Sequence, residues 1–284
     1  MTETRRTALV LGAGGLVGGA WELGVLHGLA EAGADLGSAD LIVGSSVGAV
    51  VGARVASGQG GVAELYEREV GGSAPDEPAA RLGVGKVSRY ALAVLTSRTP
   101  EEYGRKLGRL ALGAATVDEA ARRATVGRRL APVTEWPERR LLITAVDALT
   151  GELTAHDKNG GAALVDAVTA SCAIPGLWPA ATLGGRRWID GGLHSTANAH
   201  LAAGYERVVI IAPSASGNKV ILSPARQGAD LAAAGARVEV ITPDKASKQA
   251  FGRNTLDPAR RAPAARAGRA QAAAHASAVV ALWG

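Results

Sequence analysis

The chain has 284 residues, of which 47% are hydrophobic and 20% charged, a composition typical of a globular protein and unlike that of a disordered one. Its single cysteine, Cys172, excludes an intrachain disulfide. The net charge of +5 does not indicate a nucleic-acid partner, because no aromatic residues are interleaved among the basic ones. The sequence shows neither a secretory signal nor an apolar run of about 20 residues. We therefore expect a soluble, cytoplasmic protein whose membrane contact is at most peripheral.

The first fifty or so residues predict alternating strands and helices. Residues 7–12 form an apolar run closed by glycine, which is typical of a parallel strand buried on both faces. Residues 18–31 carry apolar side chains at helical spacing, and a second strand over residues 40–44 leads directly into a helix over 45–57. This order favours a parallel sheet with right-handed crossovers.

Further strands and helices are predicted in the rest of the chain, and we interpret residues 1–284 as one domain. Residues 60–135 predict several surface helices, which we interpret as a helical insertion that covers the site. Residues 214–284 are interpreted as a C-terminal helical extension, in which the Ala- and Arg-rich stretch from about 258 predicts one long helix. Strands are expected over 140–147, 151–156, 186–189, 207–213 and 236–241, and helices over 162–170 and 225–235.

A G-x-S-x-G pattern at residues 44–48 has Ser46 at its centre. A serine on a sharp strand-to-helix turn adopts a strained backbone, and Gly44 and Gly48 let the strand and the helix pack closely around it. The helix N-terminus also directs free N–H groups at the site, which favours a developing negative charge. The pattern predicts a nucleophile at Ser46; the alternative is a glycine-rich turn whose serine only caps the helix.

A glycine loop with the sequence Gly-Ala-Gly-Gly-Leu-Val-Gly occupies residues 12–18, between a predicted strand and a predicted helix. In one interpretation, the backbone N–H groups of Gly14 and Gly15 bind the oxyanion of a tetrahedral intermediate. Glycine would then be needed because the backbone must approach the substrate without a Cβ in the way. One such donor stabilises a transition state by roughly 3–4 kcal/mol.

A second interpretation of the glycine loop is a dinucleotide-binding fingerprint, which needs glycine at i, i+2 and i+5. Gly12, Gly14 and Gly18 fit only a loosened version of this spacing. Asp35 or Asp40 would then bind the ribose. This alternative would make the chain an NAD(P)-binding oxidoreductase.

An aspartate followed by two glycines provides a candidate acid. Asp190 ends a predicted strand and precedes Gly191 and Gly192. A serine nucleophile needs a base, which in a triad is a histidine oriented by a carboxylate. Of the five histidines, only His194 follows Asp190 closely, and we interpret it as an exposed loop or helix-start residue. The residues alone therefore make Asp190 a candidate acid, and leave open whether His194 takes part as a base.

Together these motifs resemble the patatin-like phospholipases. The resemblance covers roughly residues 7–213 and rests on motifs that occur in the family's order. They are the glycine loop, the G-x-S-x-G pattern, the block at residues 170–179, and Asp-Gly-Gly leading through Leu193 and Asn198 into the strand over 207–213.

The resemblance implies a three-layer α/β/α sandwich with a mainly parallel sheet. It also implies a catalytic dyad in which Ser46 is the nucleophile and Asp190 the general base. The implied reaction is the hydrolysis of acyl esters in phospholipids or related lipids, with no metal and no cofactor. Its partners would be the lipid substrate and a membrane surface contacted peripherally; nothing in the sequence indicates an oligomeric state.

The chain departs from the family pattern at three positions, two of them in the glycine loop. Ala13 replaces the first of three consecutive glycines, Val17 replaces an arginine, and Glu22 occupies a position where histidine is common. The loss of the arginine removes a contact for an anion or a phosphate, which bears on head-group preference more than on acyl chemistry. A catalytically inactive lipid-binding protein of the same fold is the remaining alternative.

Two groups of side chains have open interpretations. Three tryptophans near the motifs either line an acyl pocket or fill the core: Trp21, Trp178 and Trp188. Four C-terminal arginines form either a solvated helix face or a membrane-docking surface: Arg260, Arg261, Arg266 and Arg269.

Overall fold

The computed structural model of the chain describes residues 6–72, 80–81 and 83–284. Within these residues, eight strands form one sheet in the order β5-β6-β3-β2-β1-β7-β8, with β4 paired to β3. Strands β3, β2, β1, β7 and β8 are parallel, and β4, β5 and β6 pair in antiparallel fashion. The strands are β1 (Thr7–Leu11), β2 (Leu41–Ser45), β3 (Arg140–Asp147), β4 (Leu153–His156), β5 (Ala181–Leu183), β6 (Arg186–Asp190), β7 (Arg207–Ile211) and β8 (Arg237–Ile241).

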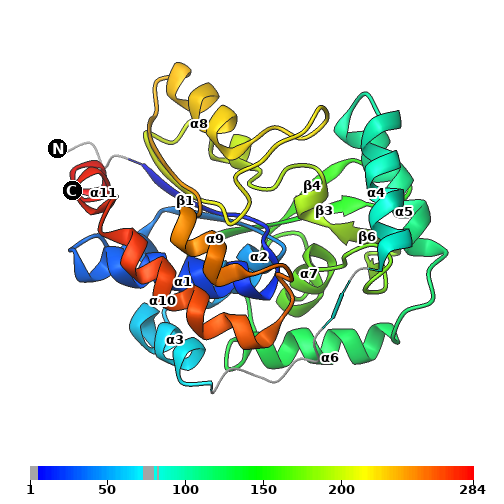
Figure 1. Cartoon of the computed structure of the whole chain (residues 1–284), viewed down its shortest axis with the longest axis horizontal. Coiled ribbons are helices and arrows are strands. Elements are labelled where there is room, and N and C mark those ends of the chain that lie inside the picture. The colour runs from blue at the N-terminus through cyan, green and yellow to red at the C-terminus, as the bar shows by residue number, and fades with distance from the viewer. Residues whose placement is uncertain (1–5, 73–79, 82) are drawn as a thin grey trace.

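Helices cover both faces of this sheet (Figure 1), which confirms the expected α/β fold. Helices α1, α2 and α7 pack on one face, with α3, α6 and α10 outside them, while α8 and the short helix η3 lie on the other. The α-helices are α1 (Gly15–Glu31), α2 (Val47–Ser57), α3 (Gly61–Val70), α4 (Val84–Thr96), α5 (Pro100–Leu112), α6 (Glu119–Leu130), α7 (Leu164–Ser171), α8 (Pro224–Ala233), α9 (Lys245–Phe251), α10 (Arg261–Ala272) and α11 (Ala276–Trp283). The short helices are η1 (Leu36–Ser38), η2 (Gly191–Leu193), η3 (Ala199–Ala202) and η4 (Pro258–Arg260).

The central strand β1 shows why its sequence is apolar without interruption. Leu9 and Leu11 belong to the core beneath α1, α2 and α10, whereas Ala8 and Val10 belong to the core beneath η3 and α8. Successive side chains of a strand point to opposite faces, so a strand covered on both faces buries every residue. Each leucine or valine buried in this way stabilises the fold by roughly 1.5–3 kcal/mol relative to an exposed one.

Close packing of α1 against α10 attaches the C-terminal part of the chain to the domain. A Cβ on Gly24 would lie 2.0 Å from the carbonyl oxygen of Ala265, and a Cβ on Gly268 would lie 2.3 Å from that of Trp21. Glycine at both positions therefore permits a backbone approach that a larger residue would prevent. Arg261 of α10 also forms a partly buried ion pair with Glu69 of α3 at 2.7 Å.

The structure corrects the prediction of one long C-terminal helix. The helical residues are divided between α10 and α11, with a turn over residues 273–275. Helix α10 packs on α1, whereas α11 packs on β7 and β8. Arg207 of β7 binds the carbonyl oxygens of Trp283 and Gly284, each at 3.0 Å. These two sets of partners override the helical propensity of an alanine-rich run.

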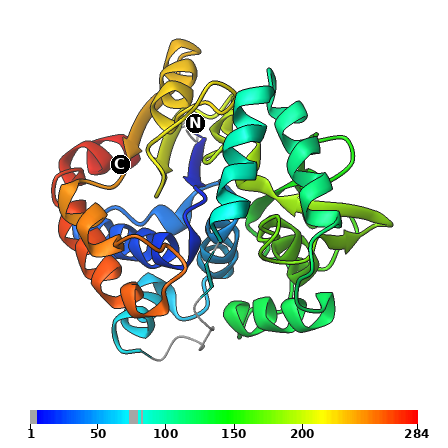
Figure 2. The ribbon, with the colours of Figure 1, turned by 45° about the vertical axis from the view of Figure 1, so that its right-hand side comes forward.

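The predicted helical insertion over residues 60–135 contains α3, α4, α5 and α6, while residues 73–79 and 82 of this range lie outside the described residues. The four helices pack in different places. Helix α3 contacts α1 and α10, α6 contacts α7, and α5 contacts β3, β6 and η2. Only α4 and α5, which pack on each other, lie together as a pair, and Figure 2 shows them side by side.

Candidate functional site

Ser46 forms the tight turn between β2 and α2. Its φ of 56° lies in the left-handed region, which costs a residue with a side chain of order 1–3 kcal/mol. A Cβ on Gly44 would lie 2.6 Å from Ala49 Cα, and a Cβ on Gly48 would lie 2.3 Å from the carbonyl oxygen of Leu11. The two glycines of the pattern therefore let α2 begin directly against β2 and the end of β1.

The side chains of Ser46 and Asp190 are in direct contact although they lie 144 residues apart in sequence. Ser46 Oγ donates a hydrogen bond to Asp190 Oδ2 at 2.6 Å, and both residues are buried. The amide of Gly192 donates to the other carboxylate oxygen, Oδ1, at 2.8 Å and fixes its orientation. Ser46 makes no side-chain hydrogen bond to the start of α2, so the interpretation of this serine as a helix cap is wrong.

The sheet order explains how these two residues meet. Asp190 ends β6, which pairs with β3, and β3 lies beside β2, the strand that leads into Ser46. A Cβ on Gly191 would lie 2.2 Å from Thr144 Oγ1 of β3, so glycine is required for the chain to turn there. The aspartate therefore lies one strand away from the turn that carries the serine.

The pKa of Asp190 is raised to about 6 by burial. Three contacts act in the opposite direction: the hydrogen bonds from Ser46 and Gly192, and the positive charge of Arg122. Arg122 is buried on α6 and stacks on the ring of Trp178 at 4.0 Å. At neutral pH the carboxyl group is therefore ionised, yet basic enough to accept a proton from a hydroxyl group that it already contacts.

The glycine loop lies against both catalytic candidates. A Cβ on Gly48, two residues after Ser46, would lie 2.8 Å from the carbonyl oxygen of Gly12, and a Cβ on Gly192 would lie 2.5 Å from Ala13 Cβ. The structure thus brings together the three sequence motifs that were predicted separately.

Gly14 and Gly15 form the N-terminus of α1. In the described part of the chain, neither amide donates to a protein acceptor, as expected for the first turn of a helix. A Cβ on Gly14 would lie 2.3 Å from Pro213 Cβ, and a Cβ on Gly15, whose φ is +67°, would lie 2.7 Å from the carbonyl oxygen of Thr255. Glycine is therefore needed at both positions because other parts of the protein pack closely there, whereas we expected it to leave room for the substrate. A Cβ on Gly18 would likewise lie 2.8 Å from Pro213 Cβ.

A buried polar network behind the serine was not predicted from the sequence. Asn198, which has a φ of 54°, donates through Nδ2 to Ser45 Oγ at 2.9 Å, to Thr144 Oγ1 at 3.3 Å and to the carbonyl oxygen of Gly191 at 3.0 Å. These bonds connect β2, β3 and η2 behind the nucleophile turn. Only Asn198 had a signal in the sequence, as part of the motif that follows Asp-Gly-Gly.

The backbone of the nucleophile turn is held by the segment that follows α7. The amide of Ser46 donates to Ser171 Oγ at 2.8 Å, and Cys172 Sγ donates to the carbonyl oxygen of Ser46 at 3.2 Å. Ala173 accepts a hydrogen bond from the amide of Asp190 at 3.0 Å. This segment therefore positions both partners of the Ser46–Asp190 pair.

Histidine does not take part in this arrangement. Across the described ranges, no histidine side chain forms a hydrogen bond with Ser46 or Asp190. His194 Nδ1 lies 3.3 Å from Asn198 Oδ1, and its Nε2 lies 3.7 Å from Glu101. His194 therefore contacts the network only through Asn198, on the side of α5.

The dinucleotide interpretation of the glycine loop loses its ribose-binding acid. Asp40 precedes β2 and accepts from the amide of Thr7, at the start of β1, at 2.8 Å. Asp35 accepts from the amide of Gly37 and caps η1. The glycine loop follows the carboxyl end of β1, whereas both carboxylates lie at the amino ends of the parallel strands.

The tryptophans and the C-terminal arginines have mainly structural partners. Trp21 is fully buried and donates to Ser247 and Gln271, and Trp188 is buried and donates to the carbonyl oxygen of Leu183. Arg261 is paired with Glu69, and Arg269 with Glu31 at 2.8 Å. The four arginines do not form one uniformly solvated face.

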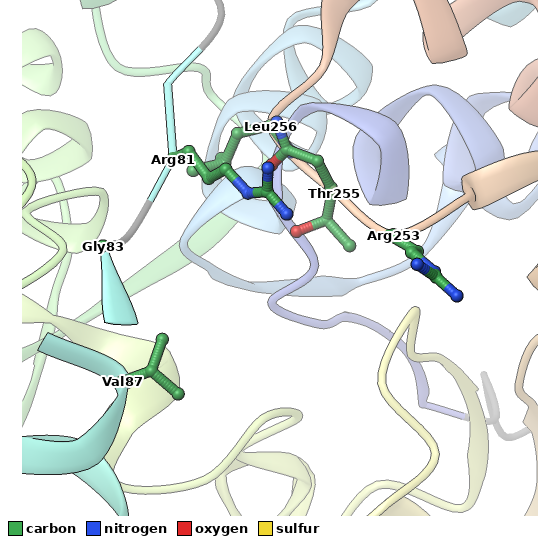
Figure 3. A pocket seen from close by; sticks show the side chains of 7 residues that line it. Arg81, Gly83, Val87, Arg253, Thr255 and Leu256 are labelled. Carbon is green, nitrogen blue, oxygen red and sulfur yellow. The ribbon is translucent and has the colours of Figure 1, made fainter. Parts of the chain in front are cut away.

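A cavity of about 660 Å³ lies between the start of α4 and the loop before η4 (Figure 3). The carbonyl oxygen of Thr255, in its wall, accepts from the amide of Val17 at 3.0 Å and contacts Gly15. The cavity therefore adjoins the glycine loop. Its lining residues are Arg81, Gly83, Val87, Arg253, Asn254, Thr255 and Leu256.

Residues 9–203 match the family model for patatin-like phospholipase, and the chain belongs to this family. Its structure is similar to that of VipD from Legionella pneumophila, with a TM-score of 0.48 and 12% identity over 96% of this chain and 67% of that chain. It is also similar to the type III effector protein ExoU, with a TM-score of 0.43 and 15% identity over 97% of this chain and 53% of that chain. Comparison with curated proteins gives no match. Among the described residues, no helix has both the length and the apolar character needed to cross a membrane.

Proposed function

We propose that the chain is a serine acyl hydrolase that cleaves lipid acyl esters with Ser46 as nucleophile and Asp190 as general base. Membership of a phospholipase family supports the lipid ester as substrate. The observation that carries the dyad is the 2.6 Å hydrogen bond from Ser46 Oγ to Asp190 Oδ2, because a base must lie within hydrogen-bond reach of the proton it removes.

In the first half of the proposed reaction, Ser46 Oγ attacks the carbonyl carbon of the ester while its proton passes to Asp190. The tetrahedral intermediate then collapses, the bond to the alcohol oxygen breaks, and Asp190 returns the proton to that leaving oxygen. In the second half, Asp190 takes a proton from water as the hydroxide attacks the acyl-enzyme. Release of the fatty acid returns the proton to Ser46 Oγ.

The amides of Gly14 and Gly15 form the proposed oxyanion hole. They lie at the N-terminus of α1, where the helix dipole favours negative charge. Each donor directed at the developing oxyanion contributes roughly 3–4 kcal/mol of transition-state stabilisation. Because internal packing holds both glycines in place, the donors need no rearrangement during the reaction.

The proposal is tested with Ser46→Ala, Asp190→Asn and a His194→Ala control, by assaying p-nitrophenyl acyl esters and labelling with a fluorophosphonate probe. We expect both dyad variants to lose at least about 10³-fold in kcat/KM. Labelling should disappear in Ser46→Ala, and His194→Ala should retain turnover. Full turnover in Asp190→Asn would contradict the dyad. An unlabelled, inactive wild-type protein that still binds lipid would instead support the non-catalytic alternative.

A further inference from the structure

Helices α4 and α5 expose an unusual number of large apolar side chains. Val87, Leu92 and Leu95 of α4 are 53%, 59% and 70% exposed, and Leu112 of α5 is 41% exposed. The solvent side of a helix ordinarily carries polar residues. We refer to these four side chains as the α4–α5 face.

The segment that carries the α4–α5 face is rich in basic residues. Helix α4 contains no acidic residue, and the two acids of residues 83–112 lie in the first turn of α5. This range therefore has a clear excess of positive charge. Its six basic residues are Lys86, Arg89, Arg98, Arg105, Lys106 and Arg109.

Helix α4 is also attached to the segment beside the proposed dyad. Tyr90 Oη donates to the carbonyl oxygen of Pro175 at 3.0 Å, and Lys86 Nζ donates to that of Gly176. Pro175 and Gly176 closely follow Ala173, whose carbonyl oxygen accepts a hydrogen bond from the amide of Asp190. A surface that contacts the outer side of α4 would therefore lie over the neighbourhood of Asp190.

The cavity shown in Figure 3 continues from this face towards the glycine loop. Val87 belongs both to the α4–α5 face and to the cavity wall, and Thr255 in the same wall contacts Gly15. Arg81 and Arg253 add positive charge to the lining. An acyl lipid that leaves a bilayer at α4 would meet a space whose wall, at Thr255 and Leu256, packs against Gly15 of the proposed oxyanion hole.

We infer that the α4–α5 face docks the protein on an anionic lipid surface, an inference that rests on the proposed lipid hydrolase function. Exposed aliphatic side chains on a segment rich in lysine and arginine match the acyl boundary and the anionic head groups of such a surface. The C-terminal arginines fit this role less well, since Arg261 and Arg269 are paired with Glu69 and Glu31. Figure 1 shows α11 and α4 at opposite ends of the molecule.

The test compares binding of the Leu92→Ser/Leu95→Ser variant and the wild type to sedimented vesicles of phosphatidylcholine, with and without phosphatidylserine. We expect wild-type binding to need phosphatidylserine, and the double variant to bind at least about 10-fold more weakly, since each buried methylene contributes about 0.8 kcal/mol. Val280→Ser is the matched control, because Val280 is 37% exposed and lies on α11, at the opposite end of the molecule from α4 (Figure 1); its binding should equal that of the wild type.

Three outcomes would overturn the inference. They are unchanged vesicle binding in the double variant, an equal loss in Val280→Ser, and sedimentation velocity showing that the α4–α5 face joins two copies of the chain. Thermal unfolding followed by circular dichroism establishes that the variants are folded; all substituted positions are exposed, so we expect unchanged melting.

The same experiment separates this inference from the proposed function. Ser46→Ala should bind vesicles as well as the wild type does, so docking can be measured even if the chain is not a hydrolase. Leu92→Ser/Leu95→Ser should hydrolyse a water-soluble p-nitrophenyl ester at the wild-type rate and lose activity only on vesicles. An equal loss of activity on the soluble ester and on vesicles would show that the substitutions disturb the catalytic site itself. This result would contradict the view that they act by weakening docking.

Discussion

Asp190 links the proposed chemistry to pH. Its pKa of about 6 results from burial, opposed by the Ser46 and Gly192 hydrogen bonds and by the charge of Arg122. A general base acts only when it is unprotonated, so kcat/KM for a soluble ester should rise through about pH 6 and then level off. Arg122→Gln should move this midpoint upwards, because the arginine lowers the pKa. A pH–rate profile with the same midpoint in both proteins would contradict this role for Arg122.

Through the same carboxyl group, a rise in pH lowers the stability of the fold while it raises the proposed activity. Its pKa in the folded protein is about 6, against 3.8 for an unperturbed aspartate, so the folded state holds the proton more tightly than the unfolded state. Proton binding by Asp190 therefore stabilises the folded state fully below about pH 4. This contribution, roughly 3 kcal/mol to the free energy of unfolding, is lost as the pH rises to about 6. We expect Asp190→Asn to unfold at higher urea concentration than the wild type at about pH 8, with the difference diminishing at acid pH.

Glu22 is a second buried carboxyl group, at a position where the family commonly has histidine. Burial raises its pKa well above the usual value, and the nearby Gly12 amide, which already donates to Ile211, opposes this only weakly. In the described part of the chain, neither carboxyl oxygen has a hydrogen-bond partner. Burial therefore favours the neutral form of Glu22 beneath the glycine loop, and ionisation of this carboxyl group would destabilise the fold.

At the scale of the elements, the contact between α1 and α10 has little room for change. Gly24→Ala would place a Cβ 2.0 Å from the carbonyl oxygen of Ala265, and overpacking of this kind costs roughly 1–3 kcal/mol. Gly127→Ala in α6 is the matched control, since its nearest contact is Val165 Cγ2 at 3.8 Å. Urea unfolding should show lower stability for Gly24→Ala and a gain of about 0.5–1 kcal/mol for Gly127→Ala. Equal effects would contradict the packing explanation.

The elements that the sequence predicts well are those whose pattern is set by burial or by a special backbone. Strands β1 and β2 are apolar because both their faces are covered, and the turn at Ser46 needs its glycines. Strand β5 has only three residues and α9 only seven, too few for a periodicity to show. The separation of α10 from α11 depends on partners far away in sequence, which an alanine-rich pattern does not reveal.

The site divides in the same way. Ser46, Asp190 and the glycines could be predicted because each lies in a local motif at a strand end. The network of Ser45, Thr144 and Asn198 could not, because it exists only once β2, β3 and the segment after η2 are neighbours. Hydrogen bonds between polar residues on different elements leave no spacing rule in the sequence.

At the scale of the whole molecule, the family match ends before the sheet does. The match covers residues 9–203, yet β7, which follows it, pairs with the central strand β1 over its full length. A fragment ending at residue 203 would expose one edge of β1 and the α10-facing side of α1. We expect it to lack cooperative unfolding by circular dichroism and to leave the β1 amides open to hydrogen exchange, whereas the full chain protects them. Protected β1 amides in the fragment would contradict this view.

The burial of Cys172 directly behind Ser46 has a practical consequence. It is the one cysteine of the chain, it is inaccessible, and its Sγ donates to the backbone of the nucleophile. A thiol-reactive dye should therefore leave the native protein unmodified. Leu95→Cys would supply a single attachment point for an environment-sensitive fluorophore on α4, and Val280→Cys on α11 a reference point at the opposite end of the molecule (Figure 1). A blue shift confined to the first, on addition of vesicles, would report the orientation of the bound molecule in real time.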